Sequence, residues 1–129
     1  MANIGGNIRG IFQVKTVQTD ESGKIVKNAI GEAVHEWREK ATANGWLGLQ
    51  SGDSKYTNFN AKIEESTHVF LCDYDEDLYA LSLPDESGAA LDVRAIFKGI
   101  VYDVLLIDNP DEMNEQLEIY LRRVGAWRG

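Results

Sequence analysis

The chain is poor in the residues on which covalent and metal chemistry depend. Its 129 residues include one cysteine, two histidines and two prolines. A single cysteine, Cys72, excludes an intrachain disulfide, and no Cys/His set has the spacing of a zinc site. The sequence also lacks an Asn-x-Ser/Thr acceptor, a glycine-rich phosphate loop and a nucleophile elbow. These absences argue against an enzyme, and we expect no catalytic residue, metal or cofactor.

Long hydrophobic runs are absent too. The first ten residues, MANIGGNIRG, have no apolar core of the signal-peptide type, and no stretch approaches the length of a membrane-spanning helix. We therefore expect a protein that is made and assembled inside a cell without contacting a membrane. A chain of this length buries roughly two-thirds of the surface that its unfolded form exposes, so the sequence predicts one domain over residues 1–129.

Positive charge is scarce in the second half of the chain. Residues 1–65 carry eight basic and eight acidic groups, residues 66–129 carry five and thirteen, and the net charge is −8. Such a surface is not expected to wrap nucleic acid, because phosphate binding needs a basic face. It is compatible with the wall of a passage through which DNA slides without sticking. The alternative is an acidic half that serves solubility alone.

The chain does contain a series of short strand patterns. Residues 100–107 form a nearly continuous apolar run, and the next pattern alternates, with one apolar face made of Leu117, Ile119 and Leu121. Residues 91–97 alternate as well, and the following Lys98-Gly99 has the length of a hairpin turn. The C-terminal third therefore predicts a three-strand meander around which the rest of the chain closes.

Further strands are predicted at residues 8–17 and 65–74, with Cys72 as a small buried hydrophobe of the second. Residues 31–37 fit a short strand or a helical turn, and residues 42–45 fit a turn. A helix is possible at residues 34–43 or 111–116, and we expect the core to include Trp37 and Trp46. Short strands separated by turns predict an all-β fold, a sandwich or a small antiparallel β-barrel of about six strands with at most one short helix.

Two stretches without periodicity, residues 50–62 and 73–88, are predicted to be long flexible loops, and residues 125–129 a flexible tail. Loops of this length often carry function, so they indicate an interaction surface. Residues 73–77 read Asp-x-Asp-x-Asp, like the opening of a calcium loop. However, Leu78 and Pro84 stand where that loop needs glycine and a bidentate glutamate. We predict a solvated acidic loop instead.

Aromatic side chains in the first loop and the tail are the candidate contacts. They lie among polar residues and outside any strand pattern, so they either pack onto their own domain or anchor a partner. We predict partner or channel contacts at Lys55, Tyr56, Asn58 and Phe59, and tail contacts at Trp127 and Arg128.

Five pieces of sequence occur in an order that carries a family resemblance: residues 31–37, Trp46-Leu47, Ser66-Thr67-His68-Val69-Phe70, Phe97-Lys98-Gly99-Ile100-Val101-Tyr102-Asp103-Val104, and Gln116-Leu117-Glu118-Ile119-Tyr120. The most specific are the Thr-His-Val strand and the Gly-x-x-Tyr-Asp-Val hairpin with its following Leu-Glu-Ile. Over residues 8–124 the chain resembles the phage head–tail joining family, the head-closure or stopper proteins of siphophages.

The resemblance implies a small antiparallel β-barrel that forms a ring, usually dodecameric, beneath the portal and its adaptor. The tail joins the other side of the ring, and a long loop, here residues 50–62, closes the DNA channel after packaging. The implied partners are further copies of the chain, the portal–adaptor complex and a tail-terminator or tail protein. Packaged DNA would pass without specific binding. The implied location is the virion neck, after assembly in the host cytoplasm.

Other functions fit the same residues. A tail-terminator or another neck ring protein also uses small β domains. A soluble β-barrel that binds a ligand or a host protein belongs to a second class, and a metal-dependent hydrolase comes last.

Overall fold

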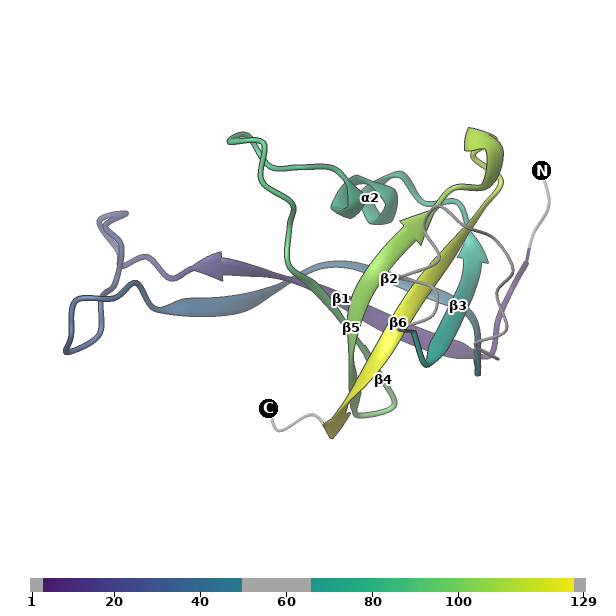
Figure 1. Ribbon diagram of the computed structural model, residues 1–129, viewed down its shortest axis with the longest axis horizontal. Helices are drawn as coiled ribbons and strands as arrows, with labels where there is room; N and C mark the ends of the chain where they lie inside the picture. Colours follow the sequence, from purple (N-terminus) through teal and green to yellow (C-terminus); the bar gives the residue numbers. More distant parts are fainter. Residues whose placement is uncertain (1–3, 50–65, 127–129) are drawn as a thin grey trace.

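In the computed structural model, which describes residues 4–49 and 66–126, six antiparallel strands form a closed barrel (Figure 1). The strands are β1 (Ile8–Val17), β2 (His35–Leu49), β3 (His68–Asp73), β4 (Val93–Phe97), β5 (Ile100–Asp108) and β6 (Gln116–Ala126). Around the barrel their order is β1-β2-β3-β6-β5-β4, and β4 pairs with β1 to close it. The predicted all-β barrel of about six strands is confirmed.

The predicted C-terminal meander is present as β4, β5 and β6. β4 and β5 pair from Arg94↔Asp103 to Phe97↔Ile100. The two residues of the hairpin turn between them, Lys98 and Gly99, have φ of 50° and 77°. Two positive φ values give the turn a twist that matches the right-handed twist of the strands. This hairpin follows from its two turn residues.

The core fills the barrel with phenylalanine rings and the inward face of β6. The ring centroids of Phe70 and Phe97 lie 4.7 Å apart, and Phe12 lies 6.1 and 6.0 Å from them. Such pairs add about 0.5–1.5 kcal/mol each beyond the area they bury. The inward residues of β6, which are fully buried, are Leu117, Ile119 and Leu121. Cys72 is 1% exposed in the same cluster, so its predicted role as a small buried hydrophobe is confirmed.

β2 runs without a break through residues 42–45, so the predicted turn there is wrong, as is a helix at residues 34–43. Gly45 pairs with β1 on one side and with β3 on the other. A β carbon at Gly45 would lie 2.1 Å from the carbonyl oxygen of Leu71 and 2.7 Å from Cζ of Phe70. The glycine is needed for this close approach of strands and not for a turn.

Neither tryptophan of β2 fills the core, contrary to the prediction. Trp46 is 47% exposed and its Nε1 donates a hydrogen bond to the carbonyl oxygen of Ile4 at 3.0 Å. Trp37 is half-buried, and the guanidinium of Arg94 lies 4.4 Å from its ring centroid. Trp37 pairs beyond the point where β4 stops pairing with β1, so no barrel interior lies beneath it.

The predicted second loop, residues 73–88, is partly ordered structure, which corrects the prediction. It contains the helix α2 (Glu76–Tyr79) and the 3-10 turn η1 (Ala80–Ser82). Leu78 is fully buried and Leu81 is 9% exposed, so this segment is anchored in the core. The possible helix at residues 111–116 is only the 3-10 turn η2 (Pro110–Glu112), and β6 extends to Ala126 in the predicted tail.

Candidate interaction surface

The connection between β1 and β2, residues 18–34, is a hairpin arm that projects away from the barrel (Figure 1). Three backbone hydrogen bonds join Gln18, Val26 and Val34 to one another where the arm begins: Gln18 N–H to Val34 O at 2.7 Å, Val26 N–H to Gln18 O at 2.9 Å, and Val34 N–H to Val26 O at 2.9 Å. Beyond this point the arm divides into two short hairpins, one closed by the bridge Thr19↔Ile25 and the other by Lys27↔Ala33.

Two turns of one kind shape the arm, one beginning at Asp20 and the other at Asn28. In each turn the side-chain oxygen accepts hydrogen bonds from the backbone N–H groups two and four residues later, at 2.9–3.0 Å. The glycine three residues on, Gly23 or Gly31, has φ of 85°. Asp85 begins a third such turn in the segment before β4. Asp or Asn at the start and glycine at a positive φ are the residues that such turns require.

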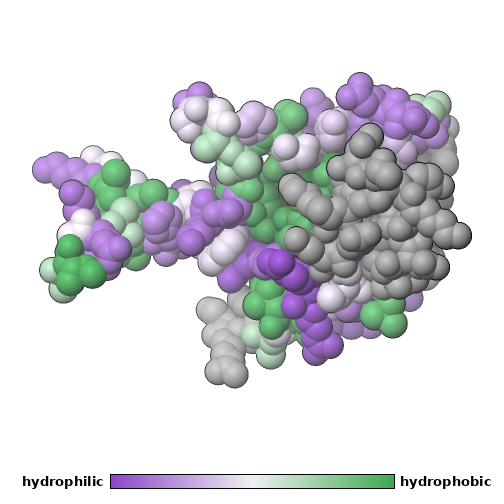
Figure 2. All heavy atoms as spheres, viewed as in Figure 1, coloured by the Kyte–Doolittle hydropathy of each residue, from purple (hydrophilic) through white to green (hydrophobic). Residues whose placement is uncertain are grey.

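The arm exposes two apolar side chains, Ile25 in the pair Thr19↔Ile25 and Ile30 within the turn that begins at Asn28. Ile25 is 53% exposed and Ile30 is 78% exposed, and hydrophobic atoms are visible at the end of the arm in Figure 2. Lys24 and Lys27 lie beside Ile25 in the chain. Two exposed isoleucines on a projecting hairpin contribute nothing to the core of their own barrel. Isolated exposed apolar side chains are common on protein surfaces, so it is the position of these two on a projecting arm that makes the arm a candidate contact surface.

A groove of about 330 Å³, lined mostly by aliphatic residues, lies on the barrel between the segment that leads into β4 and residues 104–107 of β5. Its wall on the helical side contains Leu81 and Leu83, and Leu91 and Val93 line the approach to β4. The floor is formed by residues 104–107 of β5. Leu83 is 52% exposed, so apolar surface is accessible at the mouth of the groove.

Among the described residues, β5 is paired on one side only along this groove. It pairs with β6 up to Asp108, but with β4 only over Ile100 to Asp103. Within residues 4–49 and 66–126, no strand pairs with residues 104–108 of β5 on the β4 side. Free strand edges can accept an added strand from another chain. The groove therefore lies beside a stretch of β5 that is paired only with β6 among the described residues.

One end of the barrel is strongly acidic. This acidic end comprises the end of β3, α2 and the β5–β6 connection, with Asp73, Asp75, Glu76, Asp77, Asp108, Asp111, Glu112, Glu115 and Glu118. The backbone joins these parts, since Tyr74 N–H donates to Glu115 O at 3.2 Å. Burial raises the pKa of Asp108, with Glu118 and Asp111 acting in the same direction. Burial and Glu118 raise the pKa of Tyr120 to about 12.

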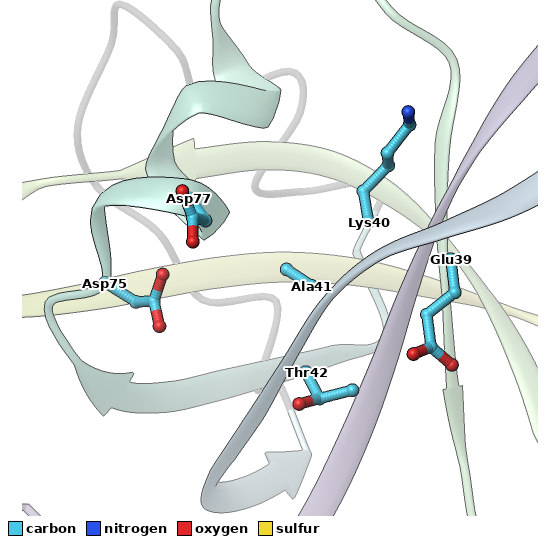
Figure 3. Close-up of a pocket in the computed structure, with 6 residues that line it drawn as sticks. All are labelled: Glu39, Lys40, Ala41, Thr42, Asp75 and Asp77. Carbon is cyan, nitrogen blue, oxygen red and sulfur yellow. The ribbon is translucent and has the colours of Figure 1, made fainter.

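A polar cavity of about 360 Å³ lies between α2 and the middle of β2 (Figure 3). Asp75 and Asp77 line one side, and the β2 residues Glu39, Lys40 and Thr42 line the other. Asp75 is already engaged, because its carboxylate caps α2 by accepting from Leu78 N–H at 3.1 Å. In the described part of the chain, no group of three or more His, Cys, Asp or Glu side chains could hold a metal ion.

The acidic triplet that resembles a calcium loop is used in structure. Besides the Asp75 cap, Asp73 Oδ1 accepts a hydrogen bond from the backbone N–H of Ile4 at 2.7 Å. Asp73 thereby ties the N-terminal segment to the end of β3. Two of the three carboxylates therefore have structural roles that involve no bound ion.

The other titratable side chains that were considered, Cys72 and His68, are packed against neighbouring residues of the barrel. The thiol of Cys72 has a pKa raised to about 12, by burial first and then by Asp75 and Asp73. The ring of His68 packs edge-on against Tyr102 at 5.0 Å, and burial, then Arg123, lowers its pKa. A thiol with a raised pKa is a poor nucleophile at neutral pH.

The sequence-predicted contact residues fall outside the described ranges. They are Lys55, Tyr56, Asn58 and Phe59 in the first loop and Trp127 and Arg128 in the tail. The exposed isoleucines of the arm and the groove beside β5 were missed. The signal that could have found the arm is the repeated Asp/Asn-x-x-Gly at residues 20–23 and 28–31, with isolated isoleucines beside polar turn residues.

No family model matches the chain, and no curated protein matches it. No helix among the described residues is long and apolar enough to cross a membrane.

Proposed function

We propose that the protein is a non-enzymatic ring subunit of the neck of a tailed phage, which joins the portal–adaptor complex to the tail. The observation that carries this proposal is a closed β-barrel from which an arm projects with Ile25 and Ile30 exposed on it. A subunit of a ring needs a stable body and outward elements that reach neighbours. The resemblance to head-closure proteins supports the same function.

The charge distribution supports a channel that DNA crosses without binding. Between residues 66 and 126 there are thirteen acidic and four basic side chains. A channel wall of this sign repels phosphate, so DNA leaves without being held. In this proposal the acidic end faces the DNA, and residues 50–62 supply the loop that closes the channel.

Deletion of the gene from the phage that encodes the chain tests the proposal. Electron microscopy should then show free tails beside capsids that have lost their DNA. Purified protein added to such an extract should restore tail attachment. Tailed, infectious particles from the deletion would refute the connector function and favour a soluble binding module. Tails of irregular length would favour a tail-terminator.

A further inference from the structure

We propose that His68 makes the junction between β3 and β6 sensitive to pH, so that the junction is closed near neutral pH and opens in mild acid. The junction consists of Thr67 and His68 at the start of β3 and of Leu121 and Arg123 on β6. Thr67 and His68 belong to the Thr-His-Val strand pattern, to which the proposed function gives no role. The device lies within one barrel, so it is independent of any role in the phage neck.

The hydroxyl of Thr67 joins the two strands. Its oxygen accepts a hydrogen bond from the backbone N–H of Arg123 at 2.8 Å and lies 2.9 Å from Nδ1 of His68. The carbonyl oxygen of Leu121 is farther from this hydroxyl, at 3.5 Å, and accepts the backbone N–H of Thr67 at 2.7 Å. A hydroxyl has one hydrogen to donate, and its nearest acceptor here is Nδ1. The contacts therefore favour a neutral imidazole with its proton on Nε2.

The surroundings of the ring favour the same neutral form. The strand neighbours of His68 are apolar, Leu49 on β2 and Leu121 on β6, and its ring packs edge-on against Tyr102 of β5, 5.0 Å between centroids. Among the described residues, the charge that acts on the ring is the guanidinium of Arg123, and the other titratable group facing it is the phenol of Tyr102. Burial first, and then Arg123, lowers the pKa of His68 below 6.5.

Protonation of His68 changes the junction in two ways. Nδ1 becomes a donor, so the Thr67 hydroxyl has to turn its hydrogen to the carbonyl oxygen of Leu121, at the longer distance of 3.5 Å. The imidazolium also places a second positive charge near Arg123 in a partly buried position. Opening the junction releases the ring to water, where the charged form is better solvated. Protonation therefore favours the open junction.

The direction of the pH dependence follows from the lowered pKa. The stabilisation that neutral His68 gives the junction is fully present above pH 6.5 and is lost as the pH falls through the lowered pKa. Histidine is the side chain whose ordinary pKa lies in this range. The chain has one other histidine, His35, which is exposed at the start of β2 and provides a matched control.

Nuclear magnetic resonance of the full chain tests the proposal. Near neutral pH the ring of His68 should show an unprotonated Nδ1 and a protonated Nε2, and its titration midpoint should lie below 6.5. Hydrogen exchange, corrected for the intrinsic effect of pH on exchange, reports the opening of the junction at the amide of Arg123. Its protection factor should fall at least about twofold between about pH 7.5 and pH 5, with a midpoint that follows the titration of His68.

Four variants separate the histidine from the hydroxyl. His68→Asn keeps a side-chain acceptor for Thr67 but does not titrate, so the fall in protection at Arg123 should disappear, whereas His35→Asn should retain it. Thr67→Val removes the acceptor of the Arg123 amide and should lower its protection at every pH. Thr67→Ser restores a hydroxyl and should recover the protection.

Several results would overturn the proposal. They are a protonated Nδ1 near neutral pH, a midpoint at or above 6.5, a wild type in which Arg123 shows no fall in protection, and a fall that persists in His68→Asn or disappears in His35→Asn. Unchanged protection in Thr67→Val would show that the hydroxyl does not hold the junction. The titration is measured on the wild type, so it decides the protonation of His68 even if a variant does not fold.

Discussion

Gly45→Ala is the substitution whose effect the structure determines most sharply. In the native backbone the new β carbon would lie 2.1 Å from the carbonyl oxygen of Leu71 and 2.7 Å from Cζ of Phe70. The first of these atoms belongs to the backbone of β3, so it cannot move without displacing the β2–β3 pairing. The Phe70 ring cannot move freely either, because it packs on Phe97 at 4.7 Å.

The expected cost follows from these contacts. Overpacking a core typically costs about 1–3 kcal/mol, and a clash with backbone belongs at or above the upper end of that range. A loss of about 3 kcal/mol is a large part of the 5–15 kcal/mol that stabilises a typical domain. It corresponds to a fall of roughly 10 °C in Tm for a chain of this size.

Gly48→Ala is the matched control on the same strand. A β carbon at Gly48 meets nothing within 4 Å, so the free energy of unfolding should change by less than about 0.5 kcal/mol. Urea denaturation followed by tryptophan fluorescence and circular dichroism measures both variants. A Gly45→Ala protein as stable as the wild type would refute the close approach and favour the turn that the sequence predicts. Equal losses in both variants would show that glycine itself, and not the contact, matters.

Three further predictions concern the core, the arm and the thiol. Leu78→Ala should lower the free energy of unfolding by about 2–5 kcal/mol, because Leu78 is fully buried where α2 joins the core. Met113→Ala, at a site 59% exposed, should change it by less than about 0.5 kcal/mol, and thermal denaturation compares the two variants. Hydrogen bonds, the largest from the Ser22 side chain, lower the pKa of Asp20 below 3.8. The ionised carboxylate therefore stabilises the turn fully above pH 3.8, and this stabilisation is lost as the pH falls through the lowered pKa. Hydrogen exchange of the Lys24 amide, which bonds to Asp20, should accelerate in that acid range. Exchange of the Glu32 amide should show no such step, because it bonds to Asn28, which does not titrate. Parallel behaviour of the two amides would contradict this account. Cys72, with a pKa of about 12 and 1% exposure, should react with a thiol reagent at pH 8 only after unfolding, and rapid labelling of the native protein would show that the barrel is open there.

Where alternation and turn chemistry agree, the sequence predicts the fold well. β1 occupies residues 8–17 as predicted, because Phe12 and Val14 alternate with polar neighbours. The β4–β5 hairpin follows from Lys98-Gly99, and the inward face of β6 from its alternating leucine and isoleucine. In each case the signal lies within a few residues, so no tertiary contact is needed to recognise it.

The errors have a common cause, which is that the deciding neighbour is distant in the chain. Gly45 resembles a turn residue until Leu71 and Phe70 are placed against it. Trp46 is a large apolar residue that suggests a core, but its neighbour Gly45 takes the inward position, and alternation turns Trp46 outward. Leu78 lies in an acidic stretch without periodicity, yet one short helix is enough to bury it.

The interaction surface was harder to predict than the fold. β4 is too short to pair with residues 104–108 of β5, and nothing in the local sequence of those residues shows it. The groove needs side chains from three segments, which only the closed barrel brings together. The arm was within reach, because both of its turns have a readable Asp/Asn-x-x-Gly pattern.

The proposal that this chain is a phage neck protein is tested most directly by a cryo-electron microscopy reconstruction of the neck of virions assembled with it. The account predicts a ring of this six-stranded barrel between the portal–adaptor complex and the tail, with the acidic end toward the DNA. A neck whose density is fully explained by other chains would contradict it.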